Sequence, residues 1–150
     1  MKKKAIILSI KGLRLTAKEK ILFSDECPWG LILFKRNIKS LIQIQSLIKD
    51  IKKLTKDKNF PILIDEEGSS VSRLSNIINH NISVNYFGNL YLINKKLCIH
   101  LYKKYLDTLC KCLKKIGLNI NTIPVLDVLR KKTSSVIGTR SFSNNPNIVK

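Results

Sequence analysis

Three consecutive carboxylates stand in a chain that is otherwise strongly basic. Asp65, Glu66 and Glu67 follow the apolar end of the segment ILIDEEGSSVSRL (residues 62–74), and Gly68 allows a tight backbone path behind them. Such carboxylates can accept hydrogen bonds from a hydroxylated ligand, and paired acids can act as general acid and base in glycoside hydrolysis. Charge runs more often lie in solvent. Spacing alone therefore favours a solvated loop and assigns no catalytic role.

The cysteine and histidine residues form no recognisable metal-binding pattern. The chain has four cysteines and two histidines, and its only close cysteine pair is the C-x-C of Cys110 and Cys112. Structural zinc sites usually need CxxC pairs or regularly spaced histidines. We expect no metal site and no other cofactor. Free thiols suit a reducing compartment.

The net charge of +18 first suggests a polyanionic partner. Only five of the 28 basic residues are arginines, however, and the lysines are spread along the chain. Proteins that read nucleic acid rely on arginine forks and placed aromatic rings. We interpret the charge as solvated helix faces, and expect weak nonspecific adhesion to polyanions but no specific nucleic-acid partner.

The amino terminus imitates a secretory leader. Its apolar run is interrupted by Lys11 after six residues, and no small-residue cleavage site follows. No apolar stretch approaches the length of a membrane span. We expect a soluble cytoplasmic protein with no membrane partner.

Short apolar runs alternate with amphipathic segments, which predicts how the reactive residues are positioned. We predict strands in residues 5–10, 30–34, 61–64 and 119–128. We predict helices after a Thr16–Glu19 capping box, after an N-cap at Ser40, and from Leu90 to Ile116 with Gly117 as its stop. This alternation implies right-handed βαβ units and a parallel sheet. In that architecture functional groups lie at the carboxyl ends of strands.

A further helix is predicted at the end of the sequence. Asn145 is a good N-cap and Pro146 a good first helical residue. Only one turn fits before Lys150, and so short a helix is not stable by itself. We expect an element interrupted at its start.

Three segments together resemble the amino-terminal half of family 3 glycoside hydrolases. They read PWGLILFKRNI (28–38), PILIDEEGSSVSRL (61–74), and PVLDV followed by VIGTRSFSNNP (124–146). They are similar to GLILFxRN, DQEGGRVxR and PVLDV with IGxRSF in single-domain bacterial β-N-acetylhexosaminidases. The resemblance covers nearly the whole chain.

The resemblance implies a partial (β/α)8 barrel, of which residues 1–150 supply about the first half as one domain with no second domain. It also implies retaining hydrolysis of terminal β-linked N-acetylglucosamine, typically from cell-wall muropeptides in the cytoplasm, without a metal. The family uses an aspartate nucleophile and a histidine acid/base on a mobile loop. Carried over by position, Asp65 would accept hydrogen bonds from sugar hydroxyls, and Arg73 and Arg140 would contact substrate. Asp127 would be a scaffold group. We expect Asp65, Arg73 and Arg140 to share one pocket rim.

The chain also departs from the family pattern. The K-H-F-P-G-H-G loop of the acid/base histidine and the strand of the nucleophile are absent, and neither His80 nor His100 has the histidine's motif. Glu66 stands where glutamine is usual. Ser69 and Ser70 replace Gly-Arg, and Ser69 would be strained if its position required a positive φ. We therefore predict no catalytic residue in this chain and little or no activity by itself.

A half barrel would leave an unpaired sheet edge and uncovered apolar faces. We expect such a chain to dimerise, to pair with a second chain that completes the barrel, or to aggregate. Two alternatives stay open: a noncatalytic remnant that binds sugar, and a basic protein that binds nucleic acid nonspecifically.

Overall fold

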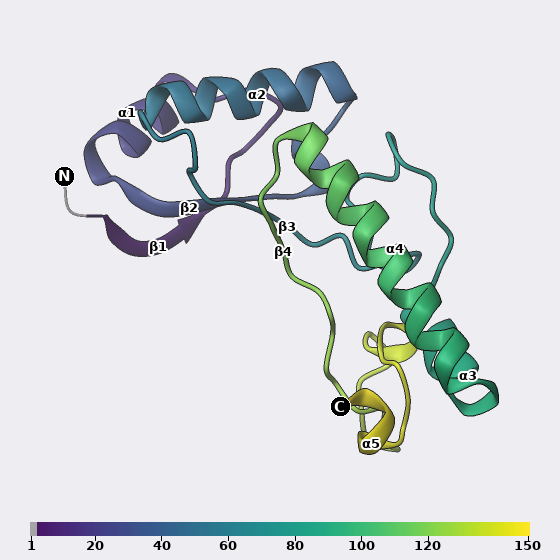
Figure 1. Ribbon diagram of the computed structural model, residues 1–150. Coiled ribbons are helices and arrows are strands. Elements are labelled where there is room, and N and C mark those ends of the chain that lie inside the picture. Colours follow the sequence, from purple (N-terminus) through teal and green to yellow (C-terminus); the bar gives the residue numbers. More distant parts are fainter. Residues whose placement is uncertain (1–2) are drawn as a thin grey trace. The chain divides into compact units, whose positions relative to one another are not determined.

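The computed structural model describes residues 3–150, which form two compact units (Figure 1). Unit 1 contains the chain up to Asp65, together with Arg73–Asn79 and Cys112–Asn121. Unit 2 contains Glu66–Ser72, His80–Lys111 and Thr122–Lys150.

Unit 1 is built on a sheet of four parallel strands. They are β1 (Lys4–Leu8), β2 (Pro28–Leu33), β3 (Ile62–Ile64) and β4 (Ile120–Asn121), and they lie side by side in chain order. Each connection therefore leads to the adjacent strand, and the strands of a (β/α)8 barrel follow one another in the same way. The predicted α/β class with parallel strands is confirmed.

Both predicted helix starts in unit 1 are confirmed. Helix α1 (Ala17–Glu26) begins with a complete capping box: Thr16 Oγ1 accepts the Glu19 N–H at 3.2 Å, and Glu19 Oε2 accepts the Thr16 N–H at 2.8 Å. Helix α2 (Leu41–Leu54) begins where Ser40 Oγ accepts a backbone N–H at 3.3 Å. These side chains satisfy amide groups that have no partner within the helix.

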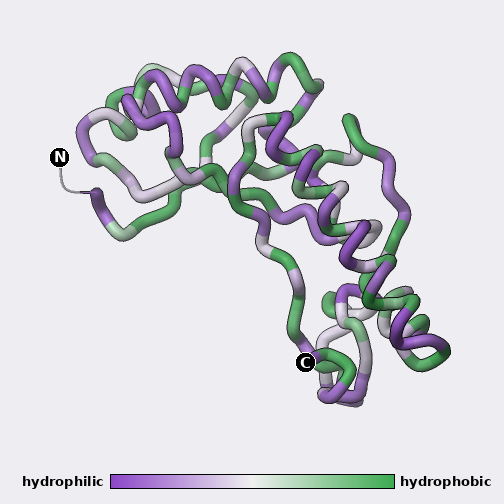
Figure 2. The backbone as a smooth tube through the Cα atoms, in the orientation of Figure 1, coloured by the Kyte–Doolittle hydropathy of each residue, from purple (hydrophilic) through white to green (hydrophobic). Residues whose placement is uncertain are grey.

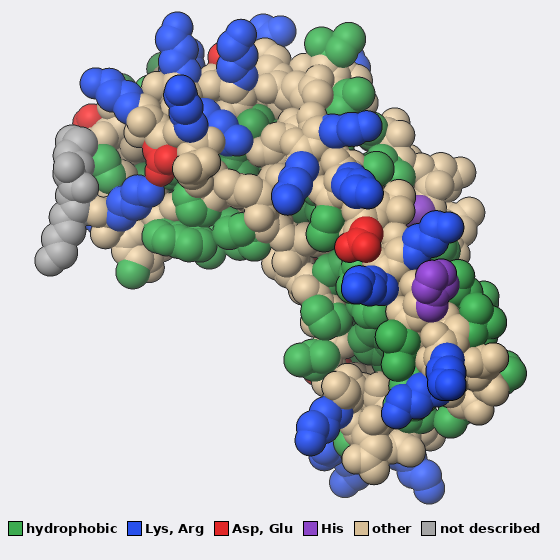
Figure 3. Space-filling view, viewed as in Figure 1, with side chains coloured by type: hydrophobic (Ala, Val, Ile, Leu, Met, Phe, Trp, Pro, Cys, Tyr) green, Lys and Arg blue, Asp and Glu red, His purple; other side chains and the backbone are tan. Residues whose placement is uncertain are grey.

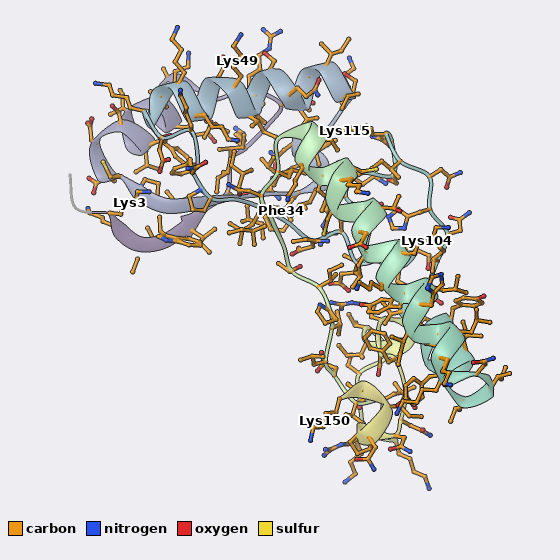
Figure 4. The ribbon with its side chains drawn as sticks, viewed as in Figure 1. Lys3, Phe34, Lys49, Lys104, Lys115 and Lys150 are labelled. Carbon is orange, nitrogen blue, oxygen red and sulfur yellow. The ribbon has the colours of Figure 1, made fainter. Side chains whose placement is uncertain are left out.

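Apolar residues recur every three or four positions along helix α2, so they lie on one face of the helix, and that face is buried. Figure 2 shows hydrophobic and hydrophilic residues alternating along it, and Figure 3 shows lysines covering its outer side. Lys49 points outward in Figure 4. The inner face contributes four buried residues, Ile44, Leu47, Ile48 and Ile51. Each such burial stabilises the fold by about 1.5–3 kcal/mol.

The predicted long helix is two helices. They are α3 (Val84–Ile93) and α4 (Lys95–Ile116), where α4 belongs to unit 2 up to Lys111 and to unit 1 from Cys112. Asn94 has extended backbone angles, and its side-chain oxygen accepts the Leu97 N–H at 3.0 Å. Asn94 thus caps α4 and ends α3. The prediction of one helix from Leu90 was wrong because the apolar spacing continues across this cap.

The carboxyl end of α4 is as predicted. Gly117 has a φ of +108°, and the N–H groups of Gly117 and Leu118 both donate to the Leu113 carbonyl, at 3.1 and 3.0 Å. A left-handed residue at this place lets the chain leave the helix while its last carbonyls stay hydrogen bonded.

The last predicted strand is much shorter than residues 119–128. β4 pairs with β3 only through Leu63–Ile120 and Ile64–Asn121. Because β3 itself has three residues, it offers a parallel neighbour few partners. The chain from Thr122 onward belongs to unit 2.

Unit 2 packs around aromatic rings. Phe87 of α3 lies 4.8 Å from Tyr102 and 5.5 Å from Tyr105 of α4, and Tyr102 lies 5.4 Å from Phe142, all measured between ring centroids. Burial raises the pKa of Tyr102 to about 12. A 3-10 turn, η2 (Gly138–Arg140), and the short helix α5 (Pro146–Val149) complete the unit.

The predicted start of α5 is confirmed, since Asn145 Oδ1 accepts the Asn147 N–H at 2.9 Å and Pro146 is the first helical residue. No helix among residues 3–150 is long and apolar enough to cross a membrane.

Apolar side chains of strand β1 and of the neighbouring strand β2 are exposed to solvent. Ile6 and Ile7 are 47% and 42% exposed, and Trp29 of β2 is 41% exposed. Within the described chain β1 pairs with β2 only. It is therefore an edge strand with an apolar surface, of the kind that pairs readily with another chain.

Candidate functional site

Asp65 and Arg73 form an ion pair at the carboxyl end of β3. Arg73 Nη2 donates to Asp65 Oδ2 at 3.2 Å, and the two side chains are 29% and 20% exposed. Asp65 is placed there because it directly follows β3, and Arg73 belongs to the same unit. The structure thus brings together two of the three residues that the sequence predicted to hold a sugar.

Phe34 lies beside this pair. The guanidinium carbon of Arg73 lies 5.7 Å from the centroid of the Phe34 ring, and that of Arg36 lies 4.6 Å from it. Guanidinium groups at such distances are attracted by the negative face of the ring. Phe34 was not among the residues that the sequence predicted for the site, and only its position directly after β2 could have indicated it.

The turn after β2 is fixed by Asn37, which is fully buried. Its Oδ1 accepts the Phe34 N–H at 2.9 Å, and its Nδ2 donates to the carbonyls of Ile10 and Gly12 at 3.0 and 2.9 Å. One side chain therefore joins the chain segments that follow β1 and β2.

Arg140, the third predicted residue, binds Glu67 in unit 2. Its Nε and Nη2 donate to the two carboxylate oxygens of Glu67 at 2.7 and 2.9 Å. Glu67 is 7% exposed. Two parallel charge-assisted hydrogen bonds make this a strong and well-oriented pair. That Arg140 shares a rim with Asp65 and Arg73 stays a prediction.

The loop after the three acids requires glycine at one position only. Gly68 has a φ of +137°, and a Cβ there would overlap the Ile82 carbonyl oxygen. Among residues 3–150, the only residues other than glycine with positive φ are Cys27 and Lys56. Ser69 therefore does not have the positive φ that would have strained its backbone. The hydroxyl groups of Ser70 and Thr139 hydrogen bond at 2.7 Å.

Glu66 makes a buried contact that the sequence did not reveal. It is fully buried, and its Oε1 lies 2.7 Å from His80 Nε2. The His80 ring lies 6.2 Å from the Tyr105 ring, and burial together with the Glu66 charge raises the pKa of the Tyr105 hydroxyl. His80 is thus engaged with Glu66, and His100 lies exposed on α4.

Asp127 contributes through its backbone. Its side chain is exposed, and its carbonyl oxygen accepts the Ser141 hydroxyl at 2.6 Å. Among the described residues, no three His, Cys, Asp or Glu side chains are grouped as a metal site would require.

Comparison with known proteins decides the family. The family described as "Glycosyl hydrolase family 3 N terminal domain" matches residues 3–150. The chain belongs to glycosyl hydrolase family 3. Among curated proteins, it is 33% identical over 146 residues to a β-hexosaminidase of Nitrosomonas eutropha, covering 96% of this chain and 41% of that protein.

Solved structures agree on the fold. NagZ from Neisseria gonorrhoeae, in complex with N-trifluoroacetyl-D-glucosamine, is 29% identical and superimposes with a TM-score of 0.86. The match covers 98% of this chain and 44% of NagZ. Native NagZ from the same organism gives a TM-score of 0.87. The four parallel strands thus correspond to the amino-terminal part of the NagZ barrel, and the predicted partial barrel is confirmed. The chain spans about two fifths of the length of the curated relatives it matches.

Proposed function

We propose that this chain is the sugar-holding amino-terminal part of a β-N-acetylhexosaminidase barrel. The observation that carries the proposal is the Asp65–Arg73 pair at the carboxyl end of β3, in a chain that belongs to family 3. The proposed substrate class is a glycan or muropeptide with a terminal β-linked N-acetylglucosamine. The glucosamine derivative bound by gonococcal NagZ supports that class.

The proposed roles follow from the chemistry of the side chains. A carboxylate accepts several hydrogen bonds, so Asp65 can accept from sugar hydroxyls while it pairs with Arg73. Arg73 and Arg140 would donate to sugar oxygens. Preorganised side chains lose little entropy when a ligand binds, because their positions are already fixed.

We propose that the chain does not hydrolyse glycosides by itself. A retaining mechanism needs a nucleophile and an acid/base group at a defined separation. The K-H-F-P-G-H-G motif is absent from the sequence. His80 and His100 both lack the motif that surrounds the family's acid/base histidine.

The proposed partner is a second polypeptide segment that completes the barrel, in the cytoplasm. The apolar edge at β1, where Ile6 and Ile7 are exposed, is a surface that another strand can cover. The four reduced cysteines among the described residues are compatible with that compartment.

A titration with N-acetylglucosamine tests sugar binding. We expect the NMR signals of Asp65, Arg73 and Arg140 to shift in the purified chain, and Asp65→Asn to weaken the response. Asp127→Asn is the matched control, because it changes an exposed carboxylate whose backbone carbonyl makes the contact. If none of the three signals shifts, sugar binding is refuted.

A chromogenic β-N-acetylglucosaminide tests the inactivity. We expect no turnover above background. A burst of leaving group followed by steady turnover would refute the claim, since it requires a nucleophile within this chain.

The charge of +18 favours nonspecific nucleic-acid binding as a second candidate function. That function predicts association with arbitrary duplexes that weakens steeply with salt. It also predicts little change when Arg73 and Arg140 are replaced by alanine, whereas sugar binding should depend on both.

A further inference from the structure

The turn between α3 and α4 exposes large aliphatic side chains (Figure 1). Leu92 and Ile93, the last two residues of α3, are 69% and 82% exposed, and Leu97 in the first turn of α4 is 44% exposed. The buried residues of α3 all lie in its first half, and they are Val84, Phe87 and Gly88. The last turn of α3 therefore extends past the packed part of unit 2.

Two lysines lie between these aliphatic residues in the chain. Lys95 and Lys96 are exposed, and neither forms an ion pair with any of residues 3–150. The Lys95 ammonium lies 5.3 Å from the centroid of the Tyr91 ring. Residues 68–106 contain no Asp or Glu, so no acid close in the sequence offsets the two charges. The turn at residues 91–97, which we call the α3–α4 tip, thus combines exposed apolar side chains with an uncompensated positive charge.

An anionic lipid surface matches both features of the α3–α4 tip. Aliphatic side chains are stabilised at the acyl boundary of a bilayer, and long lysine side chains beside them reach back to the headgroup layer. Anionic headgroups attract each such lysine. Tyr91 suits the same boundary, because its ring is apolar and its hydroxyl is polar. A nucleic-acid duplex would contact the lysines but leave Leu92 and Ile93 in water.

We propose that the α3–α4 tip is a peripheral membrane-contact site, which inserts Leu92 and Ile93 into anionic lipid while the two lysines of the tip bind the headgroups. The sequence suggests no membrane partner because it has no apolar stretch long enough to cross a bilayer. Contact with a membrane surface requires no such stretch. The inference goes beyond the proposed function and does not depend on sugar binding.

Vesicle co-sedimentation tests the apolar part of the tip. The intact chain is mixed with vesicles of phosphatidylcholine and phosphatidylglycerol in equal parts, or of phosphatidylcholine alone. We expect binding to the anionic vesicles that weakens with added salt, and little binding to the neutral ones. Leu92→Ser combined with Ile93→Ser should lower the partition coefficient about tenfold. Ile42→Ser, at a residue 81% exposed on α2, should leave it unchanged. Equal partitioning of wild type and the double serine variant would overturn the proposal.

Charge reversal separates the tip from the general charge of the chain. Lys95→Glu combined with Lys96→Glu should lower the partition coefficient about twentyfold or more, since each lysine near an anionic surface contributes about fivefold. Lys49→Glu combined with Lys53→Glu changes the net charge equally, at exposed positions of α2, and should have a much smaller effect. Equal losses in the two variants would assign the attraction to the total charge of +18 and would overturn the proposal.

Two further measurements distinguish a lipid surface from other partners of the tip. The double serine variant should keep the wild-type affinity for an arbitrary DNA duplex, because duplex contact depends on charge alone. Sedimentation velocity should give wild type and this variant the same distribution of monomers and oligomers. A variant that becomes monomeric, in a chain whose wild type does not bind the anionic vesicles, would show that a second copy covers the tip and would refute the membrane contact.

Discussion

Arg140 and Glu67 form a two-pronged ion pair, with nitrogen–oxygen distances of 2.7 and 2.9 Å. Glu67 is nearly inaccessible to solvent, whereas Arg140 lies in the turn η2, more than 70 positions later in the chain. Within unit 2 this pair connects the third of the three acids, Glu67, to the final segment of the chain. Arg140, which the family resemblance implies as a substrate contact, therefore also holds two distant segments of the chain together.

Removing the arginine from this pair should destabilise the chain. Arg140→Ala leaves the buried Glu67 carboxylate without its partner, and we expect the free energy of unfolding to fall by about 3 kcal/mol. Arg140→Lys should recover part of the loss, because it keeps the charge but not the fork. Urea denaturation measures both, with the exposed Arg130→Ala as control. Equal stability of Arg140→Ala and Arg130→Ala would contradict the structural role of the pair.

Gly68 offers a matched test of the acidic loop. Gly68→Ala places a methyl group against the Ile82 carbonyl at a φ of +137°, so we expect a loss of about 2 kcal/mol or more. In Gly12→Ala the new methyl group meets no atom within 4 Å. The control should be neutral or slightly stabilising. Thermal denaturation compares the two, and a Gly68→Ala variant as stable as Gly12→Ala would disprove the geometry of the loop.

Alkaline unfolding should report the aromatic cluster of unit 2. The pKa of Tyr102 is raised by burial from 10.0 to about 12. The unfolded chain therefore ionises this hydroxyl first, and stability that is fully present below pH 10 is lost as the pH rises toward 12. Tyr102→Phe should make stability less dependent on pH in this window. Tyr86→Phe, an exposed ring, should leave the dependence unchanged, and identical profiles for the two variants would contradict the assignment.

The apolar edge at β1 should govern self-association. Ile7→Lys places a charge on the exposed edge strand, and we expect the purified chain to become more monomeric, because charged residues disfavour strand pairing. Ile42→Lys is the control, since Ile42 is 81% exposed on α2, away from the strands. Sedimentation velocity measures the distribution of species. Association that persists in Ile7→Lys but disappears in Ile42→Lys would place the interface on the helix.

Local signals in the sequence predicted where helices begin, whereas the length of a strand depended on tertiary contacts. Capping residues at Thr16, Ser40 and Asn145 predicted three helix starts, because a cap is a local hydrogen bond that needs no tertiary context. Asn94 also caps a helix, but the apolar spacing continues on both sides of it, so the boundary between α3 and α4 was not predicted. The last strand was overpredicted because its length depends on a neighbour, β3, which is only three residues long.

The candidate site was predictable only where a local signal or a motif marked its residues. Strand ends placed Asp65 correctly, and the family motif selected Arg73, which the structure pairs with it. The motif did not reveal what the neighbouring acids contact. His80 binds Glu66 across 14 positions and Arg140 binds Glu67 across 73, and neither contact follows a local pattern.

Asn37 makes the length of the loop after β1 a determinant of the position of Phe34. Its single amide group spans two carbonyls of the segment after β1 and also receives the N–H of Phe34. An insertion or deletion near Gly12 would therefore displace the Phe34 ring, which lies beside Arg73, even though no side chain of the site had changed. Tolerance to such changes in the first loop should be low, in contrast to the usual permissiveness of surface connections.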